Sequence, residues 1–126
     1  MRIYVASKFE NKEEVRHAYK LFREAKHQIT FDWTQEDASS KLGQERISYL
    51  KECADRDFCG VVSADCFVLI AHPGMKGAYV ELGIALKTLI QICIVGDREI
   101  VDNIFFHMPN IRFYATIEQC VSALST

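Results

Sequence analysis

The chain has 126 residues, of which 49% are hydrophobic and 25% are charged, and its formal net charge is −2. This size and balance are typical of a single globular domain over residues 1–126, and the slight excess of acidic residues argues against a nucleic-acid-binding protein. No apolar run is long enough to span a membrane, no signal-peptide pattern opens the chain and the five cysteines lack metal-binding spacing, so we expect a cytoplasmic protein without membrane contact, metal or cofactor.

The hydrophobic pattern then alternates between strand and helix along the chain. Runs rich in β-branched, aromatic or continuously apolar residues predict strands, and apolar residues at helical spacing predict helices. In chain order, the prediction is strand 2–6, helix 11–25, strand 28–31, helix 44–60, strand 65–71, a helix that contains Glu81, strand 91–96, strand 111–114 and helix 116–124. Strands separated by helices predict an α/β fold, a three-layer sandwich.

Ligands of such sheets bind beyond the carboxyl ends of the strands. Three segments arrive there, residues 4–9, 31–34 and 71–81. In the third, Gly74 and Gly77 come just before a helix, so that backbone N–H groups can face the crevice and favour an anion. The spacing is neither a dinucleotide-binding fingerprint nor a P-loop, so it is a weak phosphate signal by itself.

Glu81 interrupts GMKGAYVELGIAL (residues 74–86), a run that is otherwise almost entirely small or apolar. We expect it in the first turn of the predicted helix. Two interpretations are open: the carboxylate complements the helix dipole from a solvent-facing position, or it works in the crevice.

Asp57 is a second acidic residue at an unexpected position. It continues a helical stripe of apolar residues that is expected to face inward, where an unpaired carboxylate is unfavourable. The stripe consists of Ile47, Leu50, Ala54, Asp57 and Val61. A salt bridge to Arg56 or Arg46, or a frayed last turn, is the structural alternative. Two inward carboxylates beside one crevice instead indicate acid/base chemistry on a substrate bond that lies between the two groups.

At this point the sequence resembles the nucleoside 2-deoxyribosyltransferase family, which includes the 2′-deoxynucleoside 5′-phosphate N-hydrolases. The resemblance runs through nearly the whole chain. It rests on IYVAS, HQITFDWT, the D-x-x-x-V-x-x-A-D pattern of residues 57–65, YVELGIAL, IVGD and DNIFFHMP. It implies a flavodoxin-like sheet of five parallel strands and a sugar–base bond as the target.

The resemblance also implies roles for individual residues. Glu81 matches the nucleophile that attacks C1′ of the deoxyribose, and the helix N-terminus is expected to keep it ionised. Asp57 matches the acid that helps to protonate the leaving base, and Tyr4 matches the tyrosine that orients the nucleophile. Asp32 and Trp33 lie where the second strand reaches the base pocket, and Trp33 either stacks on a base or belongs to the core.

Further residues are assigned to substrate binding. In the loop before Glu81, we assign Gly74, Met75, Lys76 and Gly77 to substrate binding, although Met75 and Lys76 follow neither the acid of the transferases nor the serine of the hydrolases. Ser7, Lys8 and Lys76 bind a 5′-phosphate, unless the two lysines are simply solvated. Asn103, and less clearly Met108, match a segment that completes the site of a neighbouring subunit, so we expect a homo-oligomer. On composition alone, the stretch IFFHMP either forms this interface or folds back onto its own core.

Three functions are therefore possible hypotheses. In each, the small-molecule partners are a deoxynucleoside or deoxynucleotide and a nucleobase. The first is transfer of 2-deoxyribose between nucleobases through a Glu81 adduct. The second is hydrolysis through the same adduct. The third is a nucleotide-binding module without turnover, which would need none of Glu81, Asp57 and Tyr4.

Overall fold

The computed structural model describes residues 1–99 and 101–126, and within them five strands form one sheet. Every neighbouring pair in this sheet is parallel, and the strand order is β2-β1-β3-β4-β5. This is the flavodoxin-like order, so the predicted sheet is confirmed. The strands are β1 (Arg2–Ala6), β2 (Gln28–Ile29), β3 (Cys66–Ile70), β4 (Gln91–Val95) and β5 (Ile111–Tyr114).

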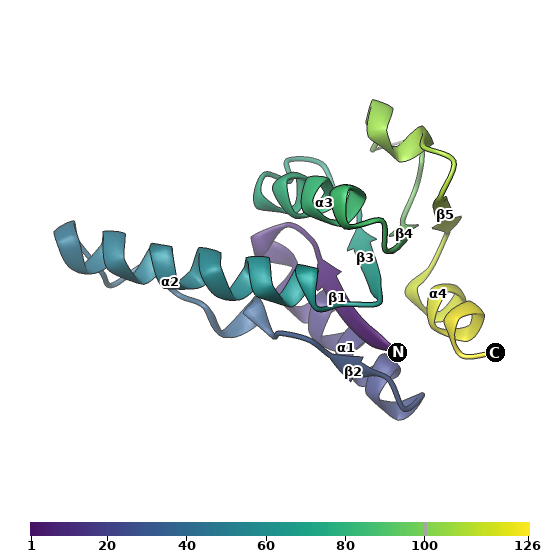
Figure 1. Cartoon of the computed structure of the whole chain (residues 1–126), viewed down its shortest axis with the longest axis horizontal. Coiled ribbons are helices and arrows are strands. Elements are labelled where there is room, and N and C mark those ends of the chain that lie inside the picture. Colours follow the sequence, from purple (N-terminus) through teal and green to yellow (C-terminus); the bar gives the residue numbers. More distant parts are fainter. Residues whose placement is uncertain (100) are drawn as a thin grey trace.

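Helices cover both faces of the sheet, which confirms the three-layer sandwich (Figure 1). On one face α1 packs against α4, and on the other α2 packs against α3. The helices are α1 (Lys12–Glu24), α2 (Gly43–Val62), α3 (Gly77–Thr88) and α4 (Ile117–Leu124). Three short 3-10 helices within the described ranges complete the fold, namely η1 (Phe9–Asn11), η2 (Trp33–Gln35) and η3 (Ile104–His107).

The core follows from the apolar strands. All five residues of β3 are buried, as expected for a central strand that is covered on both faces. Cys66 and Cys93 are also buried, with their Sγ atoms 3.9 Å apart, and both are free thiols. Because β1 and β3 lie side by side while α1 and α3 cover opposite faces, the chain diverges beyond these two strands and leaves a crevice.

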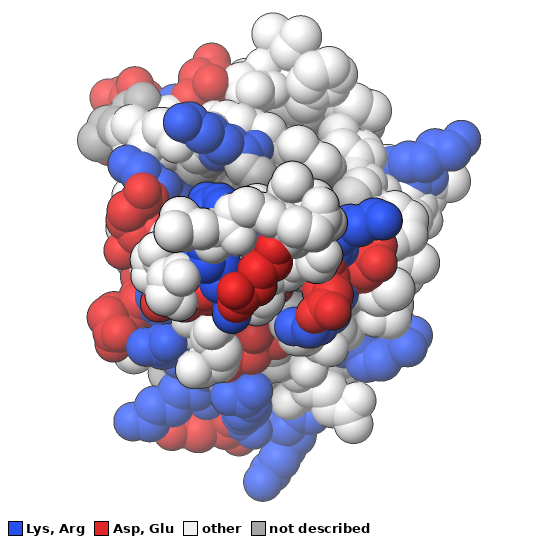
Figure 2. All heavy atoms as spheres, turned by 90° about the vertical axis from the view of Figure 1, so that its left-hand side faces the viewer, with Lys and Arg blue, Asp and Glu red and all other residues white. Residues whose placement is uncertain are grey.

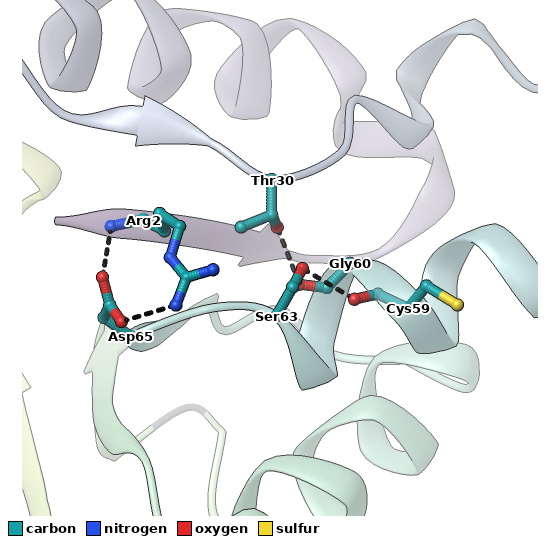
Figure 3. A network of polar contacts seen from close by, with 6 residues as sticks. All are labelled: Arg2, Thr30, Cys59, Gly60, Ser63 and Asp65. Atoms are coloured by element: carbon teal, nitrogen blue, oxygen red, sulfur yellow. Dashed lines mark hydrogen bonds and ion pairs between the residues drawn. The ribbon is translucent and has the colours of Figure 1, made fainter.

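Polar contacts fix the carboxyl end of α2 to the sheet, as Figure 3 shows. The Thr30 hydroxyl donates to the Gly60 carbonyl at 2.7 Å, and Asp65, just after the helix, accepts from the backbone N–H of Arg2 at 2.8 Å. β2 is two residues shorter than predicted, although the backbone N–H of Thr30 still donates to the Ile3 carbonyl of β1 at 2.9 Å. These contacts hold the end of α2 that carries Asp57.

The other end of α2 does not behave as predicted. Ile47 and Leu50 are 59% and 44% exposed, whereas Val61 is buried. The helix runs on past the sheet, so only its last turns contact the core (Figure 1). The expectation of one inward-facing stripe from Ile47 to Val61 is therefore wrong for its first half.

Acidic and basic side chains are interspersed on the face of the molecule shown in Figure 2. A search of the described helices finds none with the length and apolarity needed to cross a membrane.

Candidate active site

A cavity of about 660 Å³ opens beyond the carboxyl ends of β1 and β3. Its walls come from the three predicted segments and from the last turns of α2, so the predicted crevice is confirmed. Residues in or next to these segments line it, namely Ser7, Lys8, Phe9, Glu10, Trp33, Glu36, Ala54, Asp55, Asp57, Phe58, Gly74, Lys76, Gly77, Ala78, Val80, Glu81 and Ile84.

Glu81 lies at the inner wall of this cavity and accepts a hydrogen bond from the Tyr4 hydroxyl. It shares the inward side of α3 with Ala78 and Ala85, three residues before it and four after it. Burial and the Glu81 carboxylate raise the pKa of Tyr4 far above its usual range, so the phenol stays protonated as the donor. The tyrosine that was predicted to orient Glu81 therefore contacts it directly.

The structure corrects the expected position and protonation of Glu81. Helix α3 begins at Gly77, so Glu81 lies in its second turn rather than its first. Burial raises the pKa of the Glu81 carboxyl to about 7, and the hydrogen bond from Tyr4 partly opposes this effect. The helix N-terminus does not keep the group as acidic as was expected, because the dipole acts mainly within the first turn.

A glycine in α2 makes room for the Tyr4 side chain. A Cβ atom at Gly60 would lie 2.9 Å from Cε2 of Tyr4 and 2.9 Å from Cβ of Phe31. Any larger residue at position 60 would push either α2 or the tyrosine ring away. The close contact therefore lets the phenol pass beneath α2 and reach Glu81.

Asp57 faces the same cavity and has no salt bridge within the described part of the chain. Arg56 pairs instead with Glu52 at 3.0 Å, and Arg46 donates to the Ala38 carbonyl at 2.6 Å. Burial and the charge of Glu36, followed by that of Glu81, raise the pKa of Asp57 to about 8. The proposed alternative of an ion pair with Arg56 or Arg46 is therefore wrong, and the raised pKa favours the protonated form of Asp57 at neutral pH.

The two residues predicted after β2 have different positions. Trp33 is buried, donates from Nε1 to the Val5 carbonyl at 2.7 Å and also lines the cavity, so it belongs to the core and to the site wall. Asp32 is not among the lining residues. It caps η2 instead, because its Oδ1 atom accepts from the backbone N–H of Thr34 at 2.9 Å.

The loop before α3 brings most of its predicted residues to the cavity. Gly74, Lys76 and Gly77 line it, whereas the Met75 side chain is buried in the core and is not part of the lining. Gly74 has a φ of +82°, and a Cβ there would lie 3.3 Å from Nζ of Lys8. The Lys8 ammonium group therefore lies over this loop.

Ser7 also lines the cavity, and its hydroxyl donates to the Ile70 carbonyl at 2.7 Å. This bond joins the carboxyl ends of β1 and β3. Ser7 therefore holds the two strand ends together at the entrance to the crevice, next to Lys8.

Asn103 and Met108 are absent from this cavity as it is formed by the described residues of one chain. Asn103 caps η3, where its Oδ1 atom accepts from the backbone N–H of Phe105 at 2.9 Å. In the same stretch, Phe106 is buried against Tyr79 and Phe113, whereas Phe105 and Met108 are 51% and 43% exposed. The apolar stretch thus divides: Phe106 folds back onto the core, and the other side chains remain available to a partner.

Several lining residues were missed by the sequence reasoning. Phe9 and Phe58 add exposed aromatic surface, and the Phe9 ring lies 6.4 Å from that of Trp33 at an interplanar angle of 30°. Glu36 adds a third carboxyl group next to Asp57. Glu36 lies in the polar segment 34–43, where an acidic residue is ordinary, so no sequence signal separates it from its neighbours.

The comparisons with known proteins address the fold. No protein-family model and no curated protein sequence matches the chain. Among solved structures, a CMP N-glycosidase of Clostridium botulinum, BcmB, is similar with a TM-score of 0.66 and 14% identity, over 98% of both chains. A 2-deoxyribosyltransferase of Bacillus psychrosaccharolyticus is similar with a TM-score of 0.68 and 17% identity, over 96% of this chain and 90% of that chain. The chain therefore has the fold of the nucleoside 2-deoxyribosyltransferase structures, in agreement with the resemblance of its sequence to that family.

Proposed function

We propose that the protein cleaves the N-glycosidic bond of 2′-deoxynucleosides, or of their 5′-monophosphates, and transfers the deoxyribose through Glu81 to a second nucleobase. The observation that carries this proposal is the hydrogen bond from Tyr4 to Glu81 in a cavity that Asp57 also lines, where burial and the charge of Glu36 raise the pKa of Asp57. One acid is thereby set up as a nucleophile and the other as a proton donor. A binding module without turnover would need neither arrangement.

In the first step, a carboxylate oxygen of Glu81 forms a bond to C1′ while the C1′–N bond breaks. The electron pair of the broken bond passes into the base, and Asp57 gives its proton to the base, which leaves as a neutral molecule. The Tyr4 hydroxyl holds the attacking oxygen in place. The product of this step is a deoxyribosyl ester of Glu81.

In the second step, a ring nitrogen of an incoming base attacks C1′ while the ester bond between C1′ and Glu81 breaks and leaves its electron pair on the Glu81 carboxylate. The proton of that ring nitrogen passes to the Asp57 carboxylate, so both acids return to their starting forms. Water in place of the base would release deoxyribose, or its 5-phosphate, and make the protein an N-glycosidase. This hydrolytic alternative is supported by the fold likeness to an N-glycosidase.

Two lysines favour a 5′-monophosphate as the substrate. Lys8 and Lys76 both line the cavity, and Lys8 lies over the loop at Gly74. Their ammonium groups and the Ser7 hydroxyl lie at the ends of β1 and β3, near the start of α3, where the backbone also favours an anion. We further propose that Asn103 reaches the 5′ end of a ligand held by a neighbouring subunit of a homo-oligomer.

Product analysis tests the proposal. The wild type and Glu81→Gln are incubated with deoxynucleosides and deoxynucleoside 5′-monophosphates, each with and without a different free base. We expect the wild type to release the original base and, when a free base is present, to form the exchanged product. Sugar release in both conditions without exchange would identify the hydrolase, and full activity of a folded Glu81→Gln protein would refute the mechanism. Mass spectrometry of acid-quenched wild type should detect the deoxyribosyl ester on Glu81.

A further inference from the structure

Glu36 is a cavity residue that the proposed reaction leaves without a role. It lies at the carboxyl end of η2, where its backbone N–H donates to the Trp33 carbonyl at 3.0 Å. Because Trp33 is anchored in the core, the position of Glu36 is fixed by a buried residue. The side chain lines the same cavity as Asp57.

One oxygen atom of each of these two carboxyl groups is buried and lacks a hydrogen-bond partner. Oε2 of Glu36 and Oδ1 of Asp57 are both shielded from solvent. Neither atom has a hydrogen-bond partner among residues 1–99 and 101–126. The cations that α2 carries nearby are engaged elsewhere, Arg56 with Glu52 and Arg46 with the Ala38 carbonyl. Two buried carboxylates without partners are unfavourable when both are charged, so this pair favours the state in which one of them carries a proton.

Asp57 and Glu36 have different hydrogen-bonding roles when only one of them carries a proton. Burial and the charges of Glu36 and Glu81 raise the pKa of Asp57 to about 8, and the charge of Arg56 partly opposes this effect. The pair then presents one O–H donor, on Asp57, beside one acceptor, on Glu36. Aromatic side chains from Phe9, Trp33 and Phe58 line the same cavity and provide flat apolar surface for a planar ring.

We propose that Glu36 and Asp57 together read one edge of the nucleobase and select bases that carry an amino group beside a ring nitrogen, namely cytosine or adenine. This inference rests on the proposed function and specifies its substrate class. Asp57 donates to the ring nitrogen that receives the electron pair when the glycosidic bond breaks, N3 of cytosine or N7 of adenine. Glu36 accepts a hydrogen bond from the exocyclic amino group.

Bases with a keto group in place of the amino group do not fit this pair. In uracil and hypoxanthine, the exocyclic oxygen would face the Glu36 carboxylate, and two acceptors repel each other. Exchanging the roles of the two acids would satisfy uracil, with Glu36 donating to O4 and Asp57 accepting from N3–H. Asp57 would then lack the proton that the leaving base needs, so the discrimination should appear in kcat/KM.

The test compares substrates that differ in this one exocyclic group. 2′-Deoxycytidine 5′-monophosphate is compared with the 2′-deoxyuridine nucleotide, and 2′-deoxyadenosine 5′-monophosphate with the 2′-deoxyinosine nucleotide. We expect the wild type to prefer the amino member of at least one pair, and the two pairs distinguish cytosine from adenine. Glu36→Gln should reduce this preference by about ten- to a hundredfold, because the amide can donate to a keto oxygen.

Glu10→Gln is the matched control. Glu10 is an exposed carboxylate at the same cavity, so its replacement changes the net charge equally and should leave the preference unchanged. Circular dichroism checks that both variants are folded. An equal loss by Glu36→Gln on the amino and keto substrates, or no preference in the wild type, would overturn the inference while leaving the proposed function intact.

Equilibrium binding separates the two hypotheses if no substrate is cleaved. Dissociation constants of the same four nucleotides are measured for the wild type and Glu36→Gln. Amino-selective binding that depends on Glu36 would support the inference even though the proposed reaction had failed. Binding without that selectivity, or no binding of any of the four, would overturn it.

Discussion

Replacing Glu81 by glutamine should stabilise the folded protein at alkaline pH and much less at acidic pH. The pKa of Glu81 rises from 4.5 to about 7 on folding, chiefly because the carboxyl is buried. At pH values between these two pKa values, the folded protein therefore keeps a proton on Glu81 that the unfolded chain has released. The free energy of unfolding falls as the pH rises through this range. A glutamine at position 81 has no proton to lose, so its stability lacks this component.

The size of the effect follows from the two pKa values. Each pKa unit corresponds to about 1.36 kcal/mol, so the wild type loses roughly 3 kcal/mol in total from this one group. Roughly 1 kcal/mol of that loss has already occurred at pH 5, because the unfolded glutamate is mostly ionised there. We therefore expect the advantage of Glu81→Gln over the wild type to grow by roughly 2–3 kcal/mol between pH 5 and pH 8.

Urea unfolding followed by circular dichroism at pH 5 and pH 8 measures this difference. Comparing the variant with the wild type at each pH cancels the titration of the groups that do not interact with Glu81. Glu10→Gln serves as the control, since Glu10 is exposed and its replacement should give the same small change at both pH values. A Glu81→Gln advantage that is identical at pH 5 and pH 8 would refute the burial of an ionisable carboxyl at this position.

Three further predictions concern activity. Tyr4→Phe removes a hydrogen bond that lowers the pKa of Glu81, so the acidic limb of the kcat/KM profile should move to higher pH by roughly 1–2 units; an unmoved limb would contradict the role of Tyr4. Asp57→Asn should slow the cleavage of ordinary nucleosides by roughly a hundred- to ten-thousandfold, but should affect far less those substrates whose leaving group needs no proton. Equal losses on both would indicate a structural role instead. Mixing Glu81→Ala with Asn103→Ala subunits should restore some activity if neighbouring chains share a site, and a monomer by light scattering would exclude that arrangement.

The layout of the fold could be predicted because its strands carry a strong signal. β3 is continuously apolar and fully buried, and β1 and β5 begin and end where the sequence pattern places them. The stripe on α2 was over-interpreted, because periodicity identifies an apolar face but does not say what covers it. Ile47 and Leu50 have the correct spacing and yet extend beyond the sheet.

The site was predictable where a charge breaks an apolar pattern. Glu81 and Asp57 stand out for this reason, and the fold brings both to one cavity. Met75 gave the opposite error, since an apolar residue in a glycine-containing loop can turn inward to the core, as it does here. Glu36 could not be predicted from the sequence, because an acidic residue in a polar segment is ordinary. Only the fold shows that it lies beside Asp57.

The neighbours of the two central acids explain why they differ in protonation. Both acids are carboxyl groups that share one cavity, and burial raises the pKa of each. Glu81 also receives a hydrogen bond from Tyr4, which favours its charged form, whereas Asp57 lies beside the Glu36 carboxylate, which favours its neutral form. The pKa of Glu81, about 7, is therefore below that of Asp57, about 8, and this order favours an ionised Glu81 beside a protonated Asp57, as the proposed mechanism requires. In the proposed mechanism, the hydrogen bond from Tyr4 to Glu81 and the proximity of Glu36 to Asp57 therefore support the different roles of the two acids.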